Sequence, residues 1–445
     1  MNDRISRLLA AAGLAAALPA LGQAPAPPGP EALTVRRAAE LALERAPHLA
    51  STRAAREESD AEASLARDAF HPSAWFTSTP GYTYGLPSTV AGRVPAVAGV
   101  EIRQTLYDPA RRSGALQAEA AAAGVDAALE RACRETVEAA VAAYARCFMD
   151  QDRIASARRR VDAAEAIVER VEALTQEGRR TELELERAKL QAARARLKLL
   201  NAESDRDLDQ LELKRLIGWP GSSPLILAGD PDGVIPELQA AENLAATRAA
   251  DPELSSLGRE VELLRRSVKL ESKRFGPIIE AAAQYQRLAK FNDYDKYYLT
   301  FTPDNVSIGV TIGIPLWTGG RYGDGVRRAR ARLEHAEAQL RSRESDLEIT
   351  VRRAEAAVAR SIAEKSLSRR SQGIAEQDLS TLQLLVREGR SELSDLDERE
   401  LALADADEEA ARAELGSVLE RVRLLALRGD LSRALLGFDP PCAAP

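Results

Sequence analysis

Residues 306–321 read VSIGVTIGIPLWTGGR, and this stretch decides most of the predicted fold. From Val306 to Ile314 every second residue is Val or Ile, while the residues between them are Ser, Gly and Thr. Strict alternation with a period of two predicts a β-strand with one apolar face and one small or polar face. A soluble sheet packed on helices has the same pattern, so a lipid-facing strand and a soluble strand both stay open at this point.

The sequence contains an internal repeat, and the strand stretch belongs to its second copy. Seven residues of the first half recur 205 positions later, namely Leu33, Pro47, Leu49, Ser51, Leu65, Phe70 and Pro72. Leu106 and Tyr107 match Leu316 and Trp317 at an offset of 210, and the Glu-Gly-Arg of residues 177–179 recurs at 388–390. Because the rarer Pro, Phe, Gly and aromatic residues keep their order, the chain is interpreted as a duplication.

Each copy follows a plan of a helix, a β-hairpin and long helices. We predict the first copy over 31–218, with a helix over about 34–69, a hairpin over about 73–107 and long helices over about 111–216. We predict the second copy over 237–438, with a helix over about 239–274, a hairpin over about 278–317 and long helices over about 321–427. A linker rich in Gly and Pro, residues 219–236, joins the copies.

Two hairpins give four strands per chain, which is too few for a barrel that crosses a membrane. Backbone groups at an open sheet edge have no partner in lipid, so a membrane-spanning sheet must close on itself. Membrane barrels begin at about eight strands. If the strands face lipid, several copies of the chain must therefore pool their strands into one barrel.

The predicted helices are longer than an ordinary domain requires. Residues 111–177 contain no proline, and at 1.5 Å per residue such a run reaches roughly 100 Å. Residues 326–388 repeat the feature. The four-three spacing of a coiled-coil seam runs through Val161, Ala164, Val168, Val171 and Thr175. Simple soluble coiled coils fit this pattern as well.

The first 24 residues have the layout of a secretory signal peptide. Arg4 and Arg7 precede the apolar run 8–18, and Pro19 and small residues follow it. The run is too short for a membrane-spanning helix of roughly 20 residues. We therefore expect export from the cytoplasm; a disordered Ala-rich leader is the alternative.

Composition argues against several classes of function. The formal net charge of −7 gives no reason to expect a nucleic-acid partner. The three histidines, His48, His71 and His335, lie far apart without ligand or triad spacing, and no phosphate loop follows a predicted strand. We expect no enzyme activity, no cofactor and no metal. Cys133 and Cys147 are about 21 Å apart along one helix, beyond disulfide reach.

The junction between the last strand and the long helix of each copy resembles the TolC-like outer-membrane efflux protein family, or outer membrane factors. Residues 313–321, GIPLWTGGR, are similar to the family's Pro-Leu-Phe-Asp-Gly-Gly-Arg stretch, and residues 103–111, RQTLYDPAR, are a degraded copy. The resemblance implies a mainly α fold with membrane β-structure, in which three chains form a 12-stranded barrel on a long α-helical coiled-coil barrel. It also implies an outer-membrane location with a long periplasmic extension.

Aromatic residues near the strand ends are predicted to lie at the membrane interface. They are Tyr107, Trp317, Tyr297 and Tyr298.

Acidic residues after the two Glu-Gly-Arg turns are candidates for a pore constriction. In the family these turns lie at the periplasmic tip, and Asp395 and Glu398 match its paired acidic residues by position. Asp395 and Glu398 are spaced i,i+3 and share a helix face. Glu184 takes the single matching position of the first copy. Rings of three carboxylates would favour cations, and Arg180, Arg387 and Arg390 would offset their repulsion.

The predicted function is that of a trimeric exit duct of a tripartite efflux or type I secretion system. The resemblance implies a periplasmic adaptor protein, an inner-membrane transporter and outer-membrane lipid as partners. A soluble periplasmic coiled-coil adaptor or structural protein is the alternative, although adaptors usually combine one helical hairpin with a β-rich body.

Overall fold

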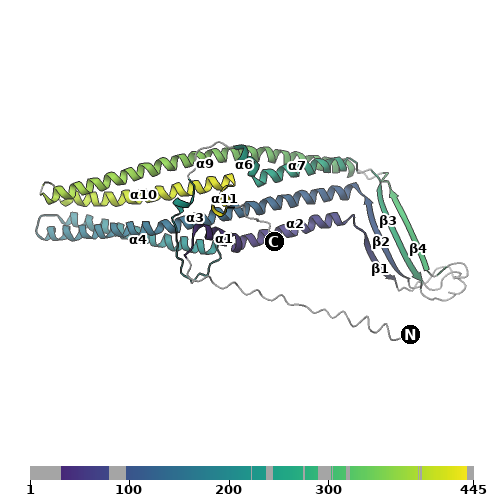
Figure 1. Ribbon diagram of the computed structural model, residues 1–445, viewed down its shortest axis with the longest axis horizontal. Coiled ribbons are helices and arrows are strands. Elements are labelled where there is room, and N and C mark those ends of the chain that lie inside the picture. The colour runs from purple at the N-terminus through teal and green to yellow at the C-terminus, as the bar shows by residue number, and fades with distance from the viewer. Residues whose placement is uncertain are drawn as a thin grey trace, which may run out of the picture.

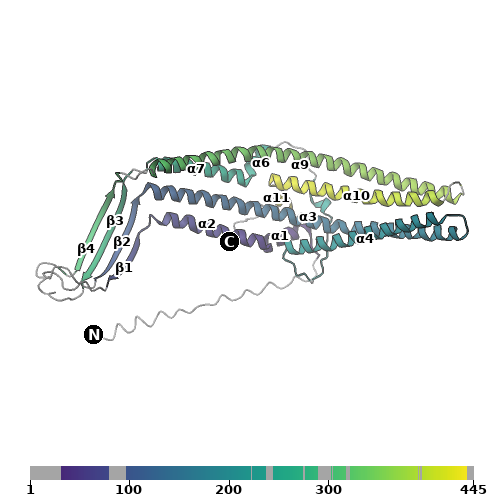
Figure 2. The same cartoon turned by 180° about the vertical axis from the view of Figure 1, so that it is seen from behind.

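The computed structural model describes residues 32–79, 97–221, 223–236, 244–273, 276–288, 302, 304–316, 321–388, 390 and 393–437. The predicted signal peptide, residues 1–24, lies outside the described residues. The described chain has a four-stranded sheet at one end and long helices that run away from it (Figure 1). The view from behind shows the same order of elements (Figure 2). The predicted mainly helical fold with a duplicated plan and four strands is confirmed.

The first helical segment of each copy is two helices, where the sequence predicted one. In the first copy α1 (Val35–Arg45) ends at Ala46, whose backbone is extended, and α2 (Pro47–Asp68) begins at the next residue. In the second copy α6 (Leu244–Ala250) and α7 (Pro252–Glu271) are separated by Asp251. The prolines cause both breaks, because proline disfavours helical backbone in the residue before it.

The four strands form one antiparallel sheet in the order β1-β2-β3-β4. They are β1 (Ser73–Thr79), β2 (Val97–Tyr107), β3 (Ile278–Leu288) and β4 (Asp304–Gly313). β2 of the first copy pairs with β3 of the second from Val97↔Leu288 to Tyr107↔Ile279, with one register shift near Tyr107. The sheet therefore joins the two copies directly.

Two very long helices start beside the sheet. α3 spans Pro109–Gln176, and its first turn is capped by Asp108, whose Oδ1 accepts from the amides of Ala110 at 2.8 Å and Arg111 at 3.2 Å. α9 spans Arg321–Arg387. With 68 and 67 residues, each helix is about 100 Å long.

Each long helix ends in a tight turn and is followed by a returning helix, α4 (Glu182–Leu216) or α10 (Leu393–Arg428). At the first turn the amide of Arg179 donates to the Leu174 carbonyl at 2.8 Å, and Gly178 has a φ of 75°. At the second turn Arg390 donates to Leu385, also at 2.8 Å. At the first turn the donor Arg179 directly follows Gly178, whose left-handed backbone lets the chain close the helix end, and this explains the glycine of that Glu-Gly-Arg turn.

The main core lies midway along the molecule, where both copies meet. It combines residues of α1, α3, α4, α10 and the short helix α11 (Leu431–Leu436). At its centre the buried Tyr144 hydroxyl donates to the carbonyl oxygens of Ala228, at 2.8 Å, and Leu33, at 3.1 Å. Burial raises the pKa of Tyr144 to about 12. This hydroxyl therefore holds the linker against the first copy.

The linker also binds the second copy. It contains α5 (Pro231–Val234), and Asp232 forms ion pairs with Lys365 of α9, at 2.8 Å, and with the buried Arg421 of α10. Arg421 also donates to the Ile235 carbonyl at 3.1 Å. The linker is thus fixed to both copies at the same level of the molecule.

The predicted coiled-coil seam of the first copy lies between α3 and α4. Val161 and Ala164 of α3 are buried against Ala192 and Ala195 of α4, and Val168 packs beside them. Small residues at the contact allow the two helices to approach closely.

Among the described residues, no helix is both long enough and apolar enough to cross a membrane.

Candidate functional site

One face of the sheet is apolar across all four strands. Register neighbours in antiparallel strands share a face, and one such row consists of Phe76, Val100, Tyr285 and Val306. The next apolar row consists of Ala74, Ile102, Ala283 and Ile308. The row between them faces the other side of the sheet and is mainly polar: Trp75, Glu101, Gln284 and Ser307.

The apolar rows are exposed to the surroundings of the chain. Ile308 is 83% exposed, and all ten residues of β4 are exposed. The outer edges of β1 and β4 have no strand partner among the described residues. A sheet with an open apolar face and two open edges requires a partner on that face and on both edges.

The helical layer has two open edges that match those of the sheet. Neighbouring helices follow the order α4, α3, α10 and α9, so α4 and α9 are the outermost (Figure 1). α4 carries three leucines at a seven-residue spacing on its exposed side, Leu183, Leu190 and Leu197, and Leu211 follows fourteen residues after Leu197. Their side chains are 51% to 61% exposed. This leucine stripe has no partner among the described residues.

α9 carries a corresponding apolar surface on the opposite edge. Leu367 and Ile374, seven residues apart, are 69% and 61% exposed. Leu384 continues this exposed surface toward the tip. Heptad-spaced apolar residues on an exposed helix are typical of a coiled-coil contact with another helix.

Glu184, predicted to line a constriction, caps the start of α4. Its Oε2 accepts from the Thr181 amide at 2.8 Å, while the Glu184 amide donates back to the Thr181 hydroxyl at 3.3 Å. Arg180 donates to Glu184 Oε1 at 2.7 Å. The Thr181 amide and Arg180 lower the pKa of Glu184 to about 2. Both oxygens of this carboxylate are therefore engaged within its own turn.

Asp395 and Glu398 lie at the start of α10, close to the second turn, and both side chains are exposed. Asp397, between them, points elsewhere: it is half-buried and forms an ion pair with Arg170 of α3. Burial raises the pKa of Asp397, and Arg170 opposes that rise. The first turns of α10 thus present two carboxylates outward and use a third to contact the other copy.

Of the four predicted interface aromatics, only Tyr107 lies within the described residues. It is the last residue of β2, is half-buried and pairs with Ile279. Its row continues to Ile312 of β4, so Tyr107 belongs to the apolar face. Trp317, Tyr297 and Tyr298 lie outside the described residues.

The leucine stripe is a feature that the sequence predictions missed. The spacing of Leu183, Leu190 and Leu197 is visible in the sequence. Leucine is frequent throughout the long helices, however, and only the structure separates leucines that face a neighbouring helix from those that do not.

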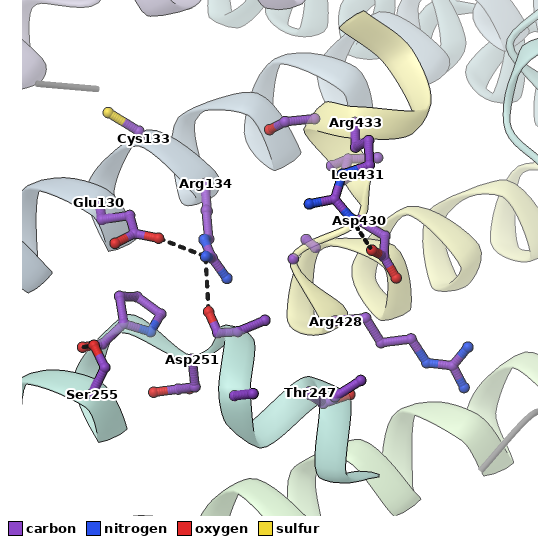
Figure 3. A pocket seen from close by; sticks show the side chains of 17 residues that line it. Glu130, Cys133, Arg134, Thr247, Asp251, Ser255, Arg428, Asp430, Leu431 and Arg433 are labelled. Carbon is purple, nitrogen blue, oxygen red and sulfur yellow. Dashed lines mark hydrogen bonds and ion pairs between the residues drawn. The ribbon is translucent and has the colours of Figure 1, made fainter. Parts of the chain in front are cut away.

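A cavity of about 560 Å³ lies beside the main core, between α3, the α6–α7 junction and the α10–α11 junction (Figure 3). Arg134 crosses it, pairs with Glu130 at 2.6 Å and donates to the Ala250 carbonyl at 2.9 Å. Arg428 pairs with Glu355 at 2.9 Å. Of these interactions, the bond from Arg134 to the Ala250 carbonyl joins the two copies across the cavity.

The comparisons with known proteins agree with this architecture. The outer membrane efflux protein family matches residues 38–219 and 243–430. The structure of CusC, a transmembrane channel, is similar with a TM-score of 0.75 at 14% identity, covering 90% of this chain and 91% of that chain. The CmeC outer membrane channel of Campylobacter jejuni gives 0.73 at 14%, covering 89% and 86%.

The outer membrane protein VceC of Vibrio cholerae gives a TM-score of 0.73 at 17% identity, with 91% of this chain and 97% of that chain covered. A comparison with curated protein sequences gives no match. At these identities the structural likenesses establish the fold, and the match over both copies establishes the family. This chain belongs to the outer membrane efflux protein family.

Proposed function

We propose that this chain is one of three identical subunits of an outer-membrane channel. The channel would serve as the passive exit duct of a tripartite efflux or type I secretion system, opened by a periplasmic adaptor and an inner-membrane transporter. The observation that carries the proposal is the exposed apolar face of a sheet whose edges, β1 and β4, are both open.

The sheet supports a shared barrel. In lipid the apolar rows need no protein cover, but the open edges of β1 and β4 must find strand partners. Pairing β4 of one chain with β1 of the next chain satisfies both edges at once. Three chains give twelve strands, which is within the range of membrane barrels. One chain has four strands, which is below the lower limit of about eight.

The exposed helices support the same ring of three chains as the sheet does. The leucine stripe of α4 and the apolar surface of α9, around Leu367 and Ile374, lie on opposite edges of the chain. An interface between two different surfaces closes into a ring when the rotation between copies is a simple fraction of a turn. The same neighbour that completes the sheet therefore covers the exposed helical edges.

The tips support a role in closing the duct. We propose that Asp395 and Glu398 line its narrowest part, where threefold symmetry would make each residue a ring of three carboxylates. Both side chains are exposed in the single chain, as a pore-lining role requires. Such rings attract cations and repel one another when the tips converge. Glu184 is the weaker candidate, because its own turn already engages both carboxylate oxygens.

Cell fractionation and gel electrophoresis test the proposal. The full chain should be in the outer membrane and should migrate in SDS as an oligomer that heating converts to a monomer. The purified protein should form discrete channels in planar bilayers. A soluble periplasmic protein that forms no channels would instead favour the adaptor alternative. If the chain does form channels, pull-down from membranes would identify the adaptor and transporter that copurify with it.

A further inference from the structure

A basic surface surrounds the junction between the sheet and the helices, and we infer that it binds anionic phospholipid headgroups. The inference rests on the proposed membrane location of the sheet and adds to it a lipid class. We call the surface the basic collar. It comprises residues 66–73, 107–112, 269–273 and 321–330.

The fold brings these four segments together. They are the end of α2 with the start of β1, the end of β2 with the start of α3, the end of α7, and the start of α9 (Figures 1 and 2). The segments contain nine Lys or Arg residues and four Asp or Glu residues. The whole chain has a formal net charge of −7, so positive charge is concentrated at this one level.

The acidic residues of the collar neutralise only part of this charge. Asp108 caps α3, and Glu271 is buried at the end of α7. Asp68 pairs with His71 at 2.9 Å, and Asp324 pairs with Arg327. Arg112, Lys273, Arg328 and Arg330 are exposed.

The collar directly adjoins the apolar face of the sheet. The last apolar row of that face is Tyr107, Ile279 and Ile312, and α3 and α9 begin within ten residues of it. The headgroup layer adds about 5–7 Å to each side of the hydrocarbon core. The first turns of these helices therefore lie at the level of the phosphates when the apolar rows lie in the hydrocarbon. Arg327, Arg328 and Arg330 lie about 9–14 Å along α9 from its start. Because side chains on a helix tilt toward its N-terminus, these long side chains extend back toward the phosphates.

The chemistry of the collar fits phosphate. Arginine presents several N–H groups in a plane and binds phosphate oxygens in pairs. Ion pairs between exposed side chains, such as Arg327 with Asp324, are weak, and a lipid phosphate can replace such a partner. Each basic residue near an anionic lipid surface strengthens binding several-fold. Neutral lipids lack the net charge on which this attraction depends.

Native mass spectrometry of the full chain in detergent tests the inference. Phosphatidylglycerol and phosphatidylcholine with the same acyl chains are added in equal amounts, and the lipids bound per oligomer are counted. The collar variant is Arg327→Gln/Arg328→Gln/Arg330→Gln. The matched control, Arg352→Gln/Arg353→Gln/Arg360→Gln, removes the same charge from exposed positions of α9, starting about 38 Å further from the sheet.

The wild-type chain should retain phosphatidylglycerol in preference to phosphatidylcholine. The collar variant should lose this preference by on the order of tenfold, while the control variant keeps it. Equal retention of both lipids by the wild type, or equal loss in both variants, would overturn the inference. The oligomer's mass is read from the same spectrum. An intact trimer without lipid preference would contradict the lipid-binding role of the collar alone. A monomer without bound lipid would contradict the proposed trimeric channel as well.

Discussion

Arg170 of α3 forms an ion pair with Asp397 of α10, so the two copies are joined near their tips. Arg170 also lies 3.5 Å from Glu400, one helical turn further along α10. Both partners are partly buried. Arg170 is the main favourable positive charge for Asp397, and Arg180 adds a smaller one. The pair therefore opposes separation of α3 from α10 where the proposed duct narrows.

Replacing Arg170 with Ala should loosen the tips. The half-buried Asp397 would lose its counter-ion, and a buried charge without a partner is unfavourable. We expect larger or more frequent openings in single-channel recordings. Arg158→Ala is the control, because Arg158 pairs with Glu203 within one copy at 3.1 Å. Identical recordings from both variants would show that the Arg170 pair does not hold the tips.

Removing the outward carboxylates should weaken block by divalent cations. In Asp395→Ala/Glu398→Ala the proposed rings lose six carboxylates per trimer, and the local attraction for cations falls. The measurement is channel conductance in planar bilayers as Mg²⁺ is added. Glu57→Ala/Glu58→Ala on α2 removes the same number of exposed carboxylates far from the tips and should leave the block unchanged. Unchanged block in Asp395→Ala/Glu398→Ala would contradict the assignment.

Polar substitution in the leucine stripe should prevent assembly. Leu190→Gln/Leu197→Gln places two amides in the expected contact between α4 and the neighbouring α9, while both positions are already exposed in the single chain. We expect less oligomer on unheated gels and unchanged helix content by circular dichroism. Ile226→Gln, at an exposed position of the linker, is the control. A normal yield of oligomer would exclude the α4–α9 contact.

Asp150 should make the chain more stable at mildly acidic pH. Its side chain is 1% exposed and pairs with Arg153 at 2.8 Å, but Oδ2 has no hydrogen-bond partner. Burial, together with the neighbouring Asp209, raises the pKa of Asp150 to about 6. Because the folded chain then holds a proton that the unfolded chain releases near pH 4, stability rises as pH falls from about 7 to 4.

The Asp150 contribution reaches about 3 kcal/mol per chain for a shift of about two pKa units. Asp150→Asn should therefore raise the melting temperature at pH 7.5 and flatten its increase toward pH 5.5. Asp205→Asn, at a half-exposed position that also pairs with Arg153, is the control. An unchanged pH profile in Asp150→Asn would mean that another group titrates.

The repeat, the four strands and the long helices were predictable because each depends on local patterns. Alternation in residues 306–314 and the lack of proline in residues 111–177 are such patterns. The break before Pro47 was also visible in the sequence, but the helical periodicity on both sides of it outweighed the proline. A helix of the whole segment would have required helical backbone at Ala46, which its proline neighbour disfavours.

The candidate site was less predictable because its parts come from distant segments. Position after the turn selected Asp395 and Glu398, but only packing shows that Asp397 is the carboxylate used to contact α3. The capping role of Glu184 follows from the Thr181 spacing and could have been recognised as a Thr-x-x-Glu capping box. The basic collar is not apparent in the sequence, since its four segments lie far apart along the chain and only the fold brings them to one level.

The pairing of β2 with β3 has a consequence for the symmetry of the proposed pore. Within one chain this seam joins the two copies, and the seam between β4 and the next β1 would repeat it between chains. A ring of three chains is thus a ring of six similar halves in which alternate halves differ. The first half locks its acidic residue into a helix cap, while the second presents two carboxylates. Because each chain carries one half of each kind, the two kinds of tip can differ in sequence. In the proposed ring, the three tips of one kind could therefore move while the three tips of the other kind hold the ring closed.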